Sequence, residues 1–138
     1  MKIKLIDYGY KNAPMRAHSN DAGADVYSTI EYVLKAHESK KIPLGLGIRL
    51  PDGYVAFVCP RSGLSSKGIT CELAPIDSGY TGEIHAIVTN NTNEDFVINC
   101  DDRIGQLVVM PVIICDFIDE KEVIENERGA NGFGSTGH

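Results

Sequence analysis

Five short segments of this chain mix glycine with acidic, hydroxyl, arginine and aromatic side chains, so each could act on an anionic ligand. Glycine lets backbone amides approach a ligand closely, and hydroxyl and guanidinium groups donate hydrogen bonds to phosphate-like oxygens. Carboxylates can bind a cation or accept a proton. The five segments are residues 21–28, 60–68, 74–83, 102–108 and 128–138.

The first two segments offer a cation ligand and an anion site. Asp21 and Asp25 could bind a hard cation through oxygen, and the alternative is a turn with solvated acids. In the second segment a strand is followed by Arg61 and Ser62 and then by a short helix. Free backbone N–H groups at a helix start point toward an anion, so this segment predicts a phosphate site. The alternative is an ordinary helix start capped by serine.

The third and fourth segments offer a base and further polar contacts. Asp77 lies between the apolar Ile76 and a turn, where a carboxylate could be held as a general base. Tyr80 could stack on a sugar or a base, or it could simply cover an edge of the core. In the fourth segment Arg103 begins a strand and Gln106 interrupts its apolar face. The alternative there is a surface ion pair between neighbouring Asp and Arg side chains.

The fifth segment is a glycine-rich end with too little apolar surface to fold by itself. Residues 132–137 match G-x-G-x-x-G, but no strand precedes them and no helix can follow, so the dinucleotide-binding interpretation fails. A looser phosphate nest remains, with hydroxyls from Ser135 and Thr136. Phe133 beside Arg128 could stack on a base. We expect either a disordered end or a flap that orders over a ligand.

The elements that must position these segments are mostly strands. Short β-branched and aromatic runs alternate with turn signals every 8–12 residues or so, and this pattern is typical of a sandwich or barrel. Helical periodicity is scarce, and the one candidate helix spans residues 62–67. The expected strands are residues 3–7, 46–50, 54–59, 82–89, 96–98 and 104–118, the last bent or divided at Pro111.

Composition narrows the class of protein. A length of 138 residues fits one domain, and 43% hydrophobic with 23% charged residues is ordinary for a soluble globular protein. A net charge of −6 argues against general binding of DNA or RNA, which needs clustered Lys and Arg. The sequence shows no signal-peptide pattern and no apolar run long enough to span a membrane, so a cytoplasmic location is expected.

The cysteines do not indicate a metal or disulfide framework. None of the four forms a C-x-x-C pair, and their density is low for a disulfide-stabilised domain. Cys59 and Cys115 lie in apolar, strand-like runs, so buried reduced thiols are expected.

Taken together and in order, the five segments resemble the trimeric dUTPase family. The matching motifs are A-G-A-D-V-Y-S at 22–28, P-R-S-G-L-S-S-K at 60–67, I-D-S-G-Y-T-G-E at 76–83, R-I-G-Q-L-V at 103–108 and R-G-A-N-G-F-G-S-T-G at 128–137. The resemblance covers nearly the whole chain. The second and fifth motifs are its most specific parts.

The resemblance implies an all-β, single-domain fold, a jelly roll or β-clip-like barrel with one short helix. It also implies a homotrimer with an exchanged C-terminal tail. Residues 1–127 would form the β domain, and residues 128–138 would form a flexible flap that completes the active site. The implied activity is Mg²⁺-assisted hydrolysis of dUTP to dUMP and pyrophosphate, which keeps uracil out of DNA and supplies dUMP for dTMP synthesis.

The resemblance also implies roles for individual residues. Asp77 would be the general base that activates water, and Asp25 would hold Mg²⁺ through water. Tyr80 would pack under the deoxyribose and disfavour a 2′-hydroxyl, while Phe133 would stack on uracil. The implied substrate-binding residues are Arg61, Ser62, Gly63, Ile76, Tyr80, Gln106, Arg128, Phe133, Gly134, Ser135 and Thr136.

The chain departs from the family pattern at three places. The stretch from Gly68 to Pro75 is shorter than in many bacterial members and has no evident counterpart of an Asn often found there for uracil contact. Gly79 stands where a second Asp is common, and Ser66 and Gly68 flank Lys67 where Ala and His are frequent.

Two other functions stay open at this point. A dCTP deaminase has a related fold, but that group favours R-S-S-x-A-R where this chain has R-S-G-L-S-S, and it uses a Glu as base. A non-catalytic, nucleotide-binding regulatory trimer is the second alternative, although it has no need of the carboxylate of Asp77 or of the tail.

Overall fold

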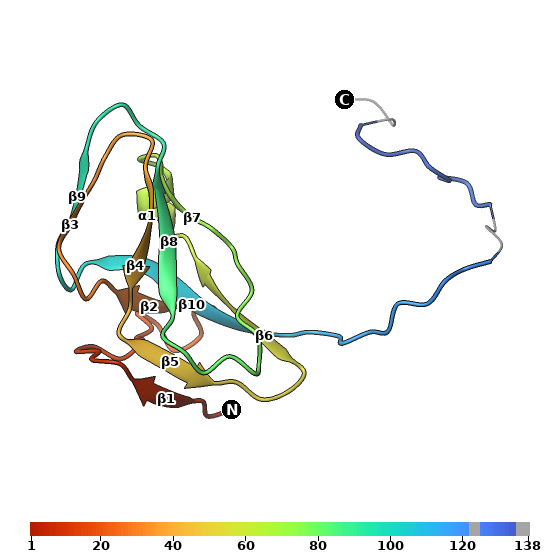
Figure 1. Ribbon diagram of the computed structural model, residues 1–138, viewed down its shortest axis with the longest axis horizontal. Coiled ribbons are helices and arrows are strands. Elements are labelled where there is room, and N and C mark those ends of the chain that lie inside the picture. Colours follow the sequence, from red (N-terminus) through yellow and green to blue (C-terminus); the bar gives the residue numbers. More distant parts are fainter. Residues whose placement is uncertain (122–124, 135–138) are drawn as a thin grey trace.

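The computed structural model describes residues 1–121 and 125–134, and within them the chain is built almost entirely of short strands (Figure 1). The prediction of a mostly β fold with one short helix is confirmed. The elements are β1 (Lys4–Asp7), β2 (Ala24–Tyr27), β3 (Tyr32–Leu34), β4 (Ser39–Pro43), β5 (Leu46–Arg49), β6 (Tyr54–Cys59), α1 (Ser62–Ser65), β7 (Ile69–Cys71), β8 (His85–Asn90), β9 (Phe96–Ile98) and β10 (Arg103–Pro111).

The strands pair antiparallel in small sheets ordered β1-β5, β2-β10-β6, β3-β9 and β4-β8-β7. The long strand β10 lies between β2 and β6 and sets the geometry of the candidate site. In its register Gln106 stands opposite Asp25 on one side and opposite Cys59 on the other. Three of the five polar segments are therefore brought to neighbouring positions by one strand.

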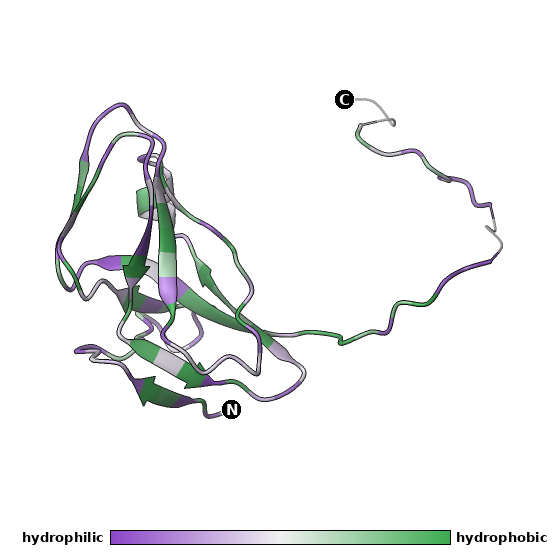
Figure 2. Ribbon diagram, viewed as in Figure 1, coloured by the Kyte–Doolittle hydropathy of each residue, from purple (hydrophilic) through white to green (hydrophobic). Residues whose placement is uncertain are grey.

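The core lies where the apolar faces of these sheets meet (Figure 2). Each fully buried Leu, Ile or Val side chain stabilises the fold by about 1.5–3 kcal/mol. Two buried polar residues, Ser28 and Asn90, are satisfied by hydrogen bonds to backbone carbonyls. Asn90, for example, donates to the carbonyls of Leu34 and Glu94. The largest fully buried apolar side chains are Val26, Leu34, Ile42, Leu44, Leu46, Ile48, Val88 and Ile98.

Two expected strands have different limits in the structure. The strand expected over residues 82–89 begins only at His85, because residues 80–83 form the loop that leads into it. The strand expected over residues 104–118 ends at Pro111. One further bond follows, from the Val112 N–H to the Gly53 carbonyl, and after it Ile113 is 87% exposed.

The cysteine prediction is only partly right. Cys71 is buried and Cys59 half-buried, and burial raises the pKa of both thiols, for Cys71 to about 11. Cys100 and Cys115 are exposed, so the expected burial of Cys115 is wrong in this chain. The apolar segment around Cys115 follows the last strand and is exposed instead of packing in the core. All four thiols are free.

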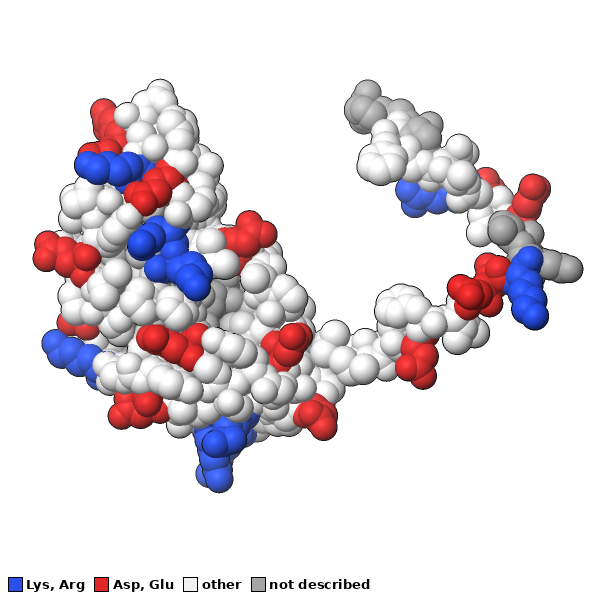
Figure 3. Space-filling view, in the orientation of Figure 1, with Lys and Arg blue, Asp and Glu red and all other residues white. Residues whose placement is uncertain are grey.

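Beyond β10 the described residues form a long tail that extends away from the β body (Figure 1). The tail carries apolar side chains first and several acidic side chains further along (Figure 3). A local turn follows, in which Arg128 Nε donates to the Asn131 carbonyl at 2.8 Å. The Phe133 side chain is fully exposed. The division between residues 127 and 128 stays a prediction.

In the part of the chain that the structure describes, no helix has the length and apolar character needed to cross a membrane.

Candidate active site

A cluster of one carboxylate and two guanidinium groups forms the first half of the candidate site. Asp25, on β2, has Oδ1 at 3.3 Å from Nε of Arg61 and Oδ2 at 3.5 Å from Nη1 of Arg103. Arg61 Nη1 also donates to the Arg103 carbonyl at 3.4 Å. Two cations around one anion leave a net positive charge, which favours an anionic ligand. Arg103, which is 54% exposed, does form the Arg–Asp pair of the alternative interpretation, but its partner is Asp25 on β2.

Gln106 closes one wall of this cluster. Its Nε2 donates to the Pro60 carbonyl at 3.1 Å, which fixes the side chain across β10 and the end of β6. Its amide oxygen lies so close to Gly23 that a Cβ at that position would overlap it. Gly23 is therefore required for the close packing of residues 21–24 against Gln106.

These groups line a cavity of about 360 Å³. Gly63 is in open space at its rim, where even an added Cβ would meet no atom within 4 Å. The helix α1 begins after Arg61, and no side-chain hydrogen bond caps it, so the alternative of a serine cap is wrong. Asp21 lines the same cavity, but its carboxylate accepts the His18 N–H at 2.8 Å within a local turn. The polar residues around the cavity are Asp21, Asp25, Arg61, Ser62, Arg103 and Gln106.

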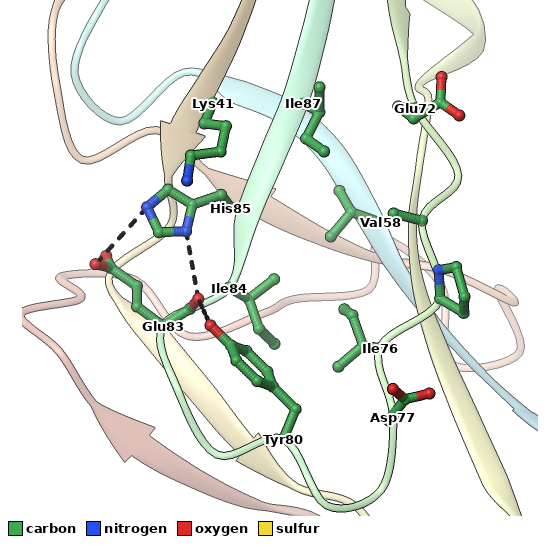
Figure 4. A pocket seen from close by; sticks show the side chains of 12 residues that line it. Lys41, Val58, Glu72, Ile76, Asp77, Tyr80, Glu83, Ile84, His85 and Ile87 are labelled. Carbon is green, nitrogen blue, oxygen red and sulfur yellow. Dashed lines mark hydrogen bonds and ion pairs between the residues drawn. The ribbon is translucent and has the colours of Figure 1, made fainter.

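The second half of the site is a slot of about 300 Å³ around Asp77 and Tyr80 (Figure 4). Ile76 is held by two backbone hydrogen bonds to Ala56, of 2.8 and 3.2 Å, which places the exposed Asp77 side chain at the mouth of the slot. Tyr80 N donates to the Asp77 carbonyl at 3.0 Å, so the two residues form the ends of one turn. Tyr80 covers no buried core edge, because 47% of it is exposed.

The slot forms where the chain segments that continue from β7 and precede β8 separate from one another. β7 pairs with β8, and one more bond follows, from the Glu72 N–H to the Ile87 carbonyl. Beyond it, the segment with Ile76 and the segment with Ile84 and Ile87 line opposite sides of the slot (Figure 4). Backbone groups along strands that part in this way are available to a flat polar ligand.

The two halves are not joined in the single chain. Among the described residues, the cavity at Asp25 and the slot at Asp77 share no lining residue. Ile76, Asp77 and Tyr80 come together, and so do Asp25 and the polar residues of the first cavity. The described part of the tail, residues 125–134, which contains Arg128, Phe133 and Gly134, lies away from the β body that carries both cavities (Figure 1). Ser135 and Thr136 lie outside the described residues.

Sequence reasoning missed several residues of the site. Arg103 was noticed as a strand start, but its pairing with Asp25 depends on the register between β10 and β2. Lys41, Glu83 and His85 line the slot, and no motif pointed to Lys41. Its strand, β4, has a polar sequence, so the position of Lys41 in the slot follows only from pairing with β8.

A resident metal held by protein ligands does not fit this site. In residues 1–121 and 125–134 there is no group of three His, Cys, Asp or Glu side chains that could hold an ion. Two carboxylates line the cavity, those of Asp21 and Asp25, and that of Asp25 lies between the two arginines. This donor set fits Mg²⁺, which keeps several waters and binds mainly through substrate phosphates.

Comparison with known proteins shows the family to which the chain belongs. A family model described as dUTPase matches residues 9–137. The chain is 43% identical to the deoxyuridine 5′-triphosphate nucleotidohydrolase of Clostridium acetobutylicum, over 99% of this chain and 96% of that protein. Its fold matches a variant of the dUTPase of Staphylococcus bacteriophage 80alpha with dUpNHpp, at a TM-score of 0.90, 28% identity and 99% coverage of both chains. It also matches a variant of the dUTPase of phage phi11 of S. aureus with a structural Mg(II) ion, at a TM-score of 0.84, 25% identity and coverage of 91% of this chain and 100% of that one. The chain belongs to the dUTPase family.

Proposed function

We propose that this protein hydrolyses dUTP to dUMP and pyrophosphate, in the cytoplasm, and so limits the dUTP available for incorporation into DNA. The observation that carries the proposal is the exposed carboxylate of Asp77 at the mouth of a slot of about 300 Å³. A cavity with two guanidinium groups supplies the complementary anion site. Family membership supports the same activity.

The slot between the parted arms of β7 and β8 would bind the uracil. The edge of β8 that follows the Glu72–Ile87 bond has backbone donors and acceptors without a strand partner among the described residues on that side. A pyrimidine with alternating acceptor, donor and acceptor groups can replace the missing strand. Pro75 brings no N–H of its own, and the N–H of Ile76 already donates to the Ala56 carbonyl, so Ile76 would contribute its side chain to the wall of the slot.

The cavity around Asp25 would bind the triphosphate. Arg61 and Arg103 provide charge-assisted hydrogen bonds, and Ser62, Gly63 and Gln106 provide smaller polar groups and space at the rim. Donors fixed in position before the reaction stabilise negative charge that develops on phosphate oxygens. This arrangement also explains how a chain of net charge −6 can bind a strongly anionic substrate.

Asp77 would accept a proton from the attacking water. The water oxygen forms a bond to the α-phosphorus, the bond from that phosphorus to the α–β bridging oxygen breaks, and pyrophosphate leaves. The proton goes to the Asp77 carboxylate, whose place is fixed by the Ile76–Ala56 bonds. General-base assistance of this kind contributes about 10²–10⁴-fold in rate.

Asp25 would hold Mg²⁺ through a water molecule, and the substrate phosphates would provide the direct ligands. When bound, the ion offsets the negative charge of the triphosphate and orients it. The phage phi11 relative contains a structural Mg(II) ion, which supports magnesium binding within the family in general.

The complete site would form in a homotrimer. The Asp25 cavity and the Asp77 slot are separate in one chain, so a neighbour must supply one half. Apolar residues just after β10 support the assembly, because Ile113, Ile114, Phe117 and Ile118 are 82–94% exposed. The tail of a third subunit, with Arg128, Phe133, Gly134, Ser135 and Thr136, would close over the nucleotide as a flap formed by residues 128–138.

The test is pyrophosphate release from dUTP, UTP and dTTP, with and without Mg²⁺, beside ammonia release from dCTP. We expect dUTP to be the preferred substrate and Mg²⁺ to stimulate the reaction. Ammonia from dCTP without pyrophosphate from dUTP would contradict the proposal and favour a deaminase. A protein that binds these nucleotides but releases neither pyrophosphate nor ammonia would be a nucleotide-binding protein without this catalytic activity.

A further inference from the structure

The hydroxyl of Tyr80 is hydrogen-bonded to Glu83, which lies two residues before β8. It donates to the backbone carbonyl of Glu83 at 2.8 Å, while Tyr80 N donates to the Asp77 carbonyl (Figure 4). The ring lies directly over Gly82, where an added Cβ would come within 2.7 Å of the ring carbon that bears the hydroxyl. Tyr80 therefore spans from the turn at Asp77 to the beginning of β8, and its orientation depends on where the Glu83 carbonyl stands.

Glu83 is itself anchored to the β body by its side chain. Its Oε2 accepts the N–H of Gly45 at 2.9 Å, at the turn between β4 and β5. The neighbouring residue Ile84 makes two backbone bonds to the same stretch, to Leu44 and Leu46. The Glu83 carboxylate thus adds one hydrogen bond to the backbone bonds between Ile84 and residues 44–46. Gly45 has a φ of +73°, a conformation that residues other than glycine rarely adopt.

A second contact reaches the same carbonyl. The Nδ1 of His85 lies 3.3 Å from the Glu83 carbonyl oxygen, and its Nε2 lies 4.0 Å from Glu83 Oε1 (Figure 4). The side chains of Glu83 and His85 are 29% and 31% exposed, so they are held against the slot wall and are not free in solvent. The carbonyl that receives the Tyr80 hydroxyl is consequently fixed from both sides.

We propose that Glu83 is a positioning residue that sets the place of the Tyr80 ring and thereby the preference for deoxyribose over ribose. The inference rests on the proposed function, in which the sugar packs against Tyr80. A ring held in one place leaves no room for a 2′-hydroxyl and offers it no hydrogen-bond partner. A displacement of about 1 Å in such a group is enough to change rates strongly.

The experiment compares Glu83→Ala, Glu83→Gln, Tyr80→Phe and the double variant Tyr80→Phe/Glu83→Ala. The measured quantity is the ratio of kcat/KM for dUTP to that for UTP, with kcat for dUTP read separately. Glu83→Ala should lower the ratio about tenfold, because a displaced Tyr80 ring no longer distinguishes the two sugars, and kcat for dUTP shows separately whether the chemical step is also affected. Glu83→Gln should keep most of the ratio, since its amide oxygen still accepts the Gly45 N–H.

The double variant separates positioning from general damage. If Glu83 acts through the Tyr80 hydroxyl, the double variant loses no more of the ratio than the larger single variant does. An unchanged ratio in Glu83→Ala, effects that multiply in the double variant, or equal losses in Glu83→Ala and Glu83→Gln would each overturn the proposal. Glu31→Ala, which removes an exposed carboxylate outside the slot, is the matched control, and thermal melting reports any loss of stability.

Calorimetry on the same variants measures the affinities for dUMP and UMP. The ratio of these affinities gives the sugar preference independently of hydrolysis. A protein that binds dUMP over UMP and loses this preference in Glu83→Ala, yet releases no pyrophosphate from dUTP, would contradict the proposed function and support the positioning role. A wild-type protein with no preference between dUMP and UMP would overturn the positioning role even if it hydrolyses dUTP.

Discussion

Asp25, on β2, and Arg61, between β6 and α1, form an ion pair of 3.3 Å that connects two of the polar motifs. Arg103 binds the second oxygen of the same carboxylate at 3.5 Å and is more exposed than Arg61, at 54% against 32%. The less exposed guanidinium is held more firmly, so its charge is the more effective in stabilising phosphate oxygens.

Replacement of Arg61 should therefore cost more than replacement of Arg103. We expect Arg61→Ala to lower kcat/KM for dUTP by about 10²–10³-fold, the usual effect of removing one fixed donor to a developing charge. Arg103→Ala should lower it by about tenfold, because the exposed side chain is better screened by solvent. Arg49→Ala, at an exposed position outside both cavities, is the control. Equal losses at Arg61 and Arg103 would contradict this ranking.

Removal of the carboxylate of Asp77 should separate binding from chemistry. Asp77→Asn keeps the size of the side chain and the backbone bonds of Ile76, so the slot is preserved. We expect dUTP binding within a few-fold of wild type and a loss of about 10²–10⁴-fold in kcat. Single-turnover kinetics with a nucleotide-binding measurement checks both. Normal turnover would remove Asp77 from its proposed role.

Part of this fold could be predicted from the sequence because its signals are local. The strand β6 has the limits expected for residues 54–59, and β9 those expected for residues 96–98, since both are apolar or β-branched runs between turns. The strand β4 was missed because its sequence, SKKIP, is polar at three positions and becomes a strand only by pairing with β8. β-Propensity is a weak guide where cross-strand contacts decide.

The candidate site shows the same division between local and distant signals. Asp77 and Tyr80 lie in one turn, so their association was visible in one motif. The pair between Arg103 and Asp25 joins residues 78 positions apart and depends on the register of β10. The strand was expected to continue to residue 118, but it ends at Pro111. The apolar character of residues 112–118 does not show whether they pack against this chain or against another, and here they are mostly exposed.

The apolar residues after β10 should determine assembly. Ile114 is 82% exposed in the single chain. Exposure of so much apolar surface to water is unfavourable unless another subunit covers it. We expect Ile114→Asp to shift the protein from trimer toward monomer and to reduce dUTP hydrolysis in parallel, because the proposed site is built from more than one subunit. Sedimentation at several concentrations measures the first effect. Lys121→Asp, a charge change at an exposed position of the same tail, is the control. A wild-type protein that is monomeric and fully active would contradict the proposed assembly.

Deletion of residues 129–138 should affect activity and leave the assembly intact. The deleted residues follow all of the described strands, and Phe133 makes no buried contact in the single chain. We expect a folded trimer with nearly abolished turnover, because the aromatic ring and the hydroxyl groups of the flap are gone. Thermal melting, sedimentation and pyrophosphate release together check this. Aggregation, or unchanged turnover, would show that the segment is not a flap.

Cys71 should make the folded state less stable at alkaline pH. Burial raises the pKa of its thiol from 9.0 to about 11, and the thiol also donates to the Val58 carbonyl. Between these two values the unfolded chain loses the proton and the folded chain keeps it, so unfolding becomes more favourable as pH rises above about 9. The loss should approach about 3 kcal/mol near pH 11, at about 1.4 kcal/mol for each unit of difference in pKa. Cys71→Ala has no such proton, so its free energy of unfolding in urea should fall less steeply than that of wild type between pH 9 and 11. Parallel pH profiles for the two proteins would show that the thiol ionises equally well in the folded chain.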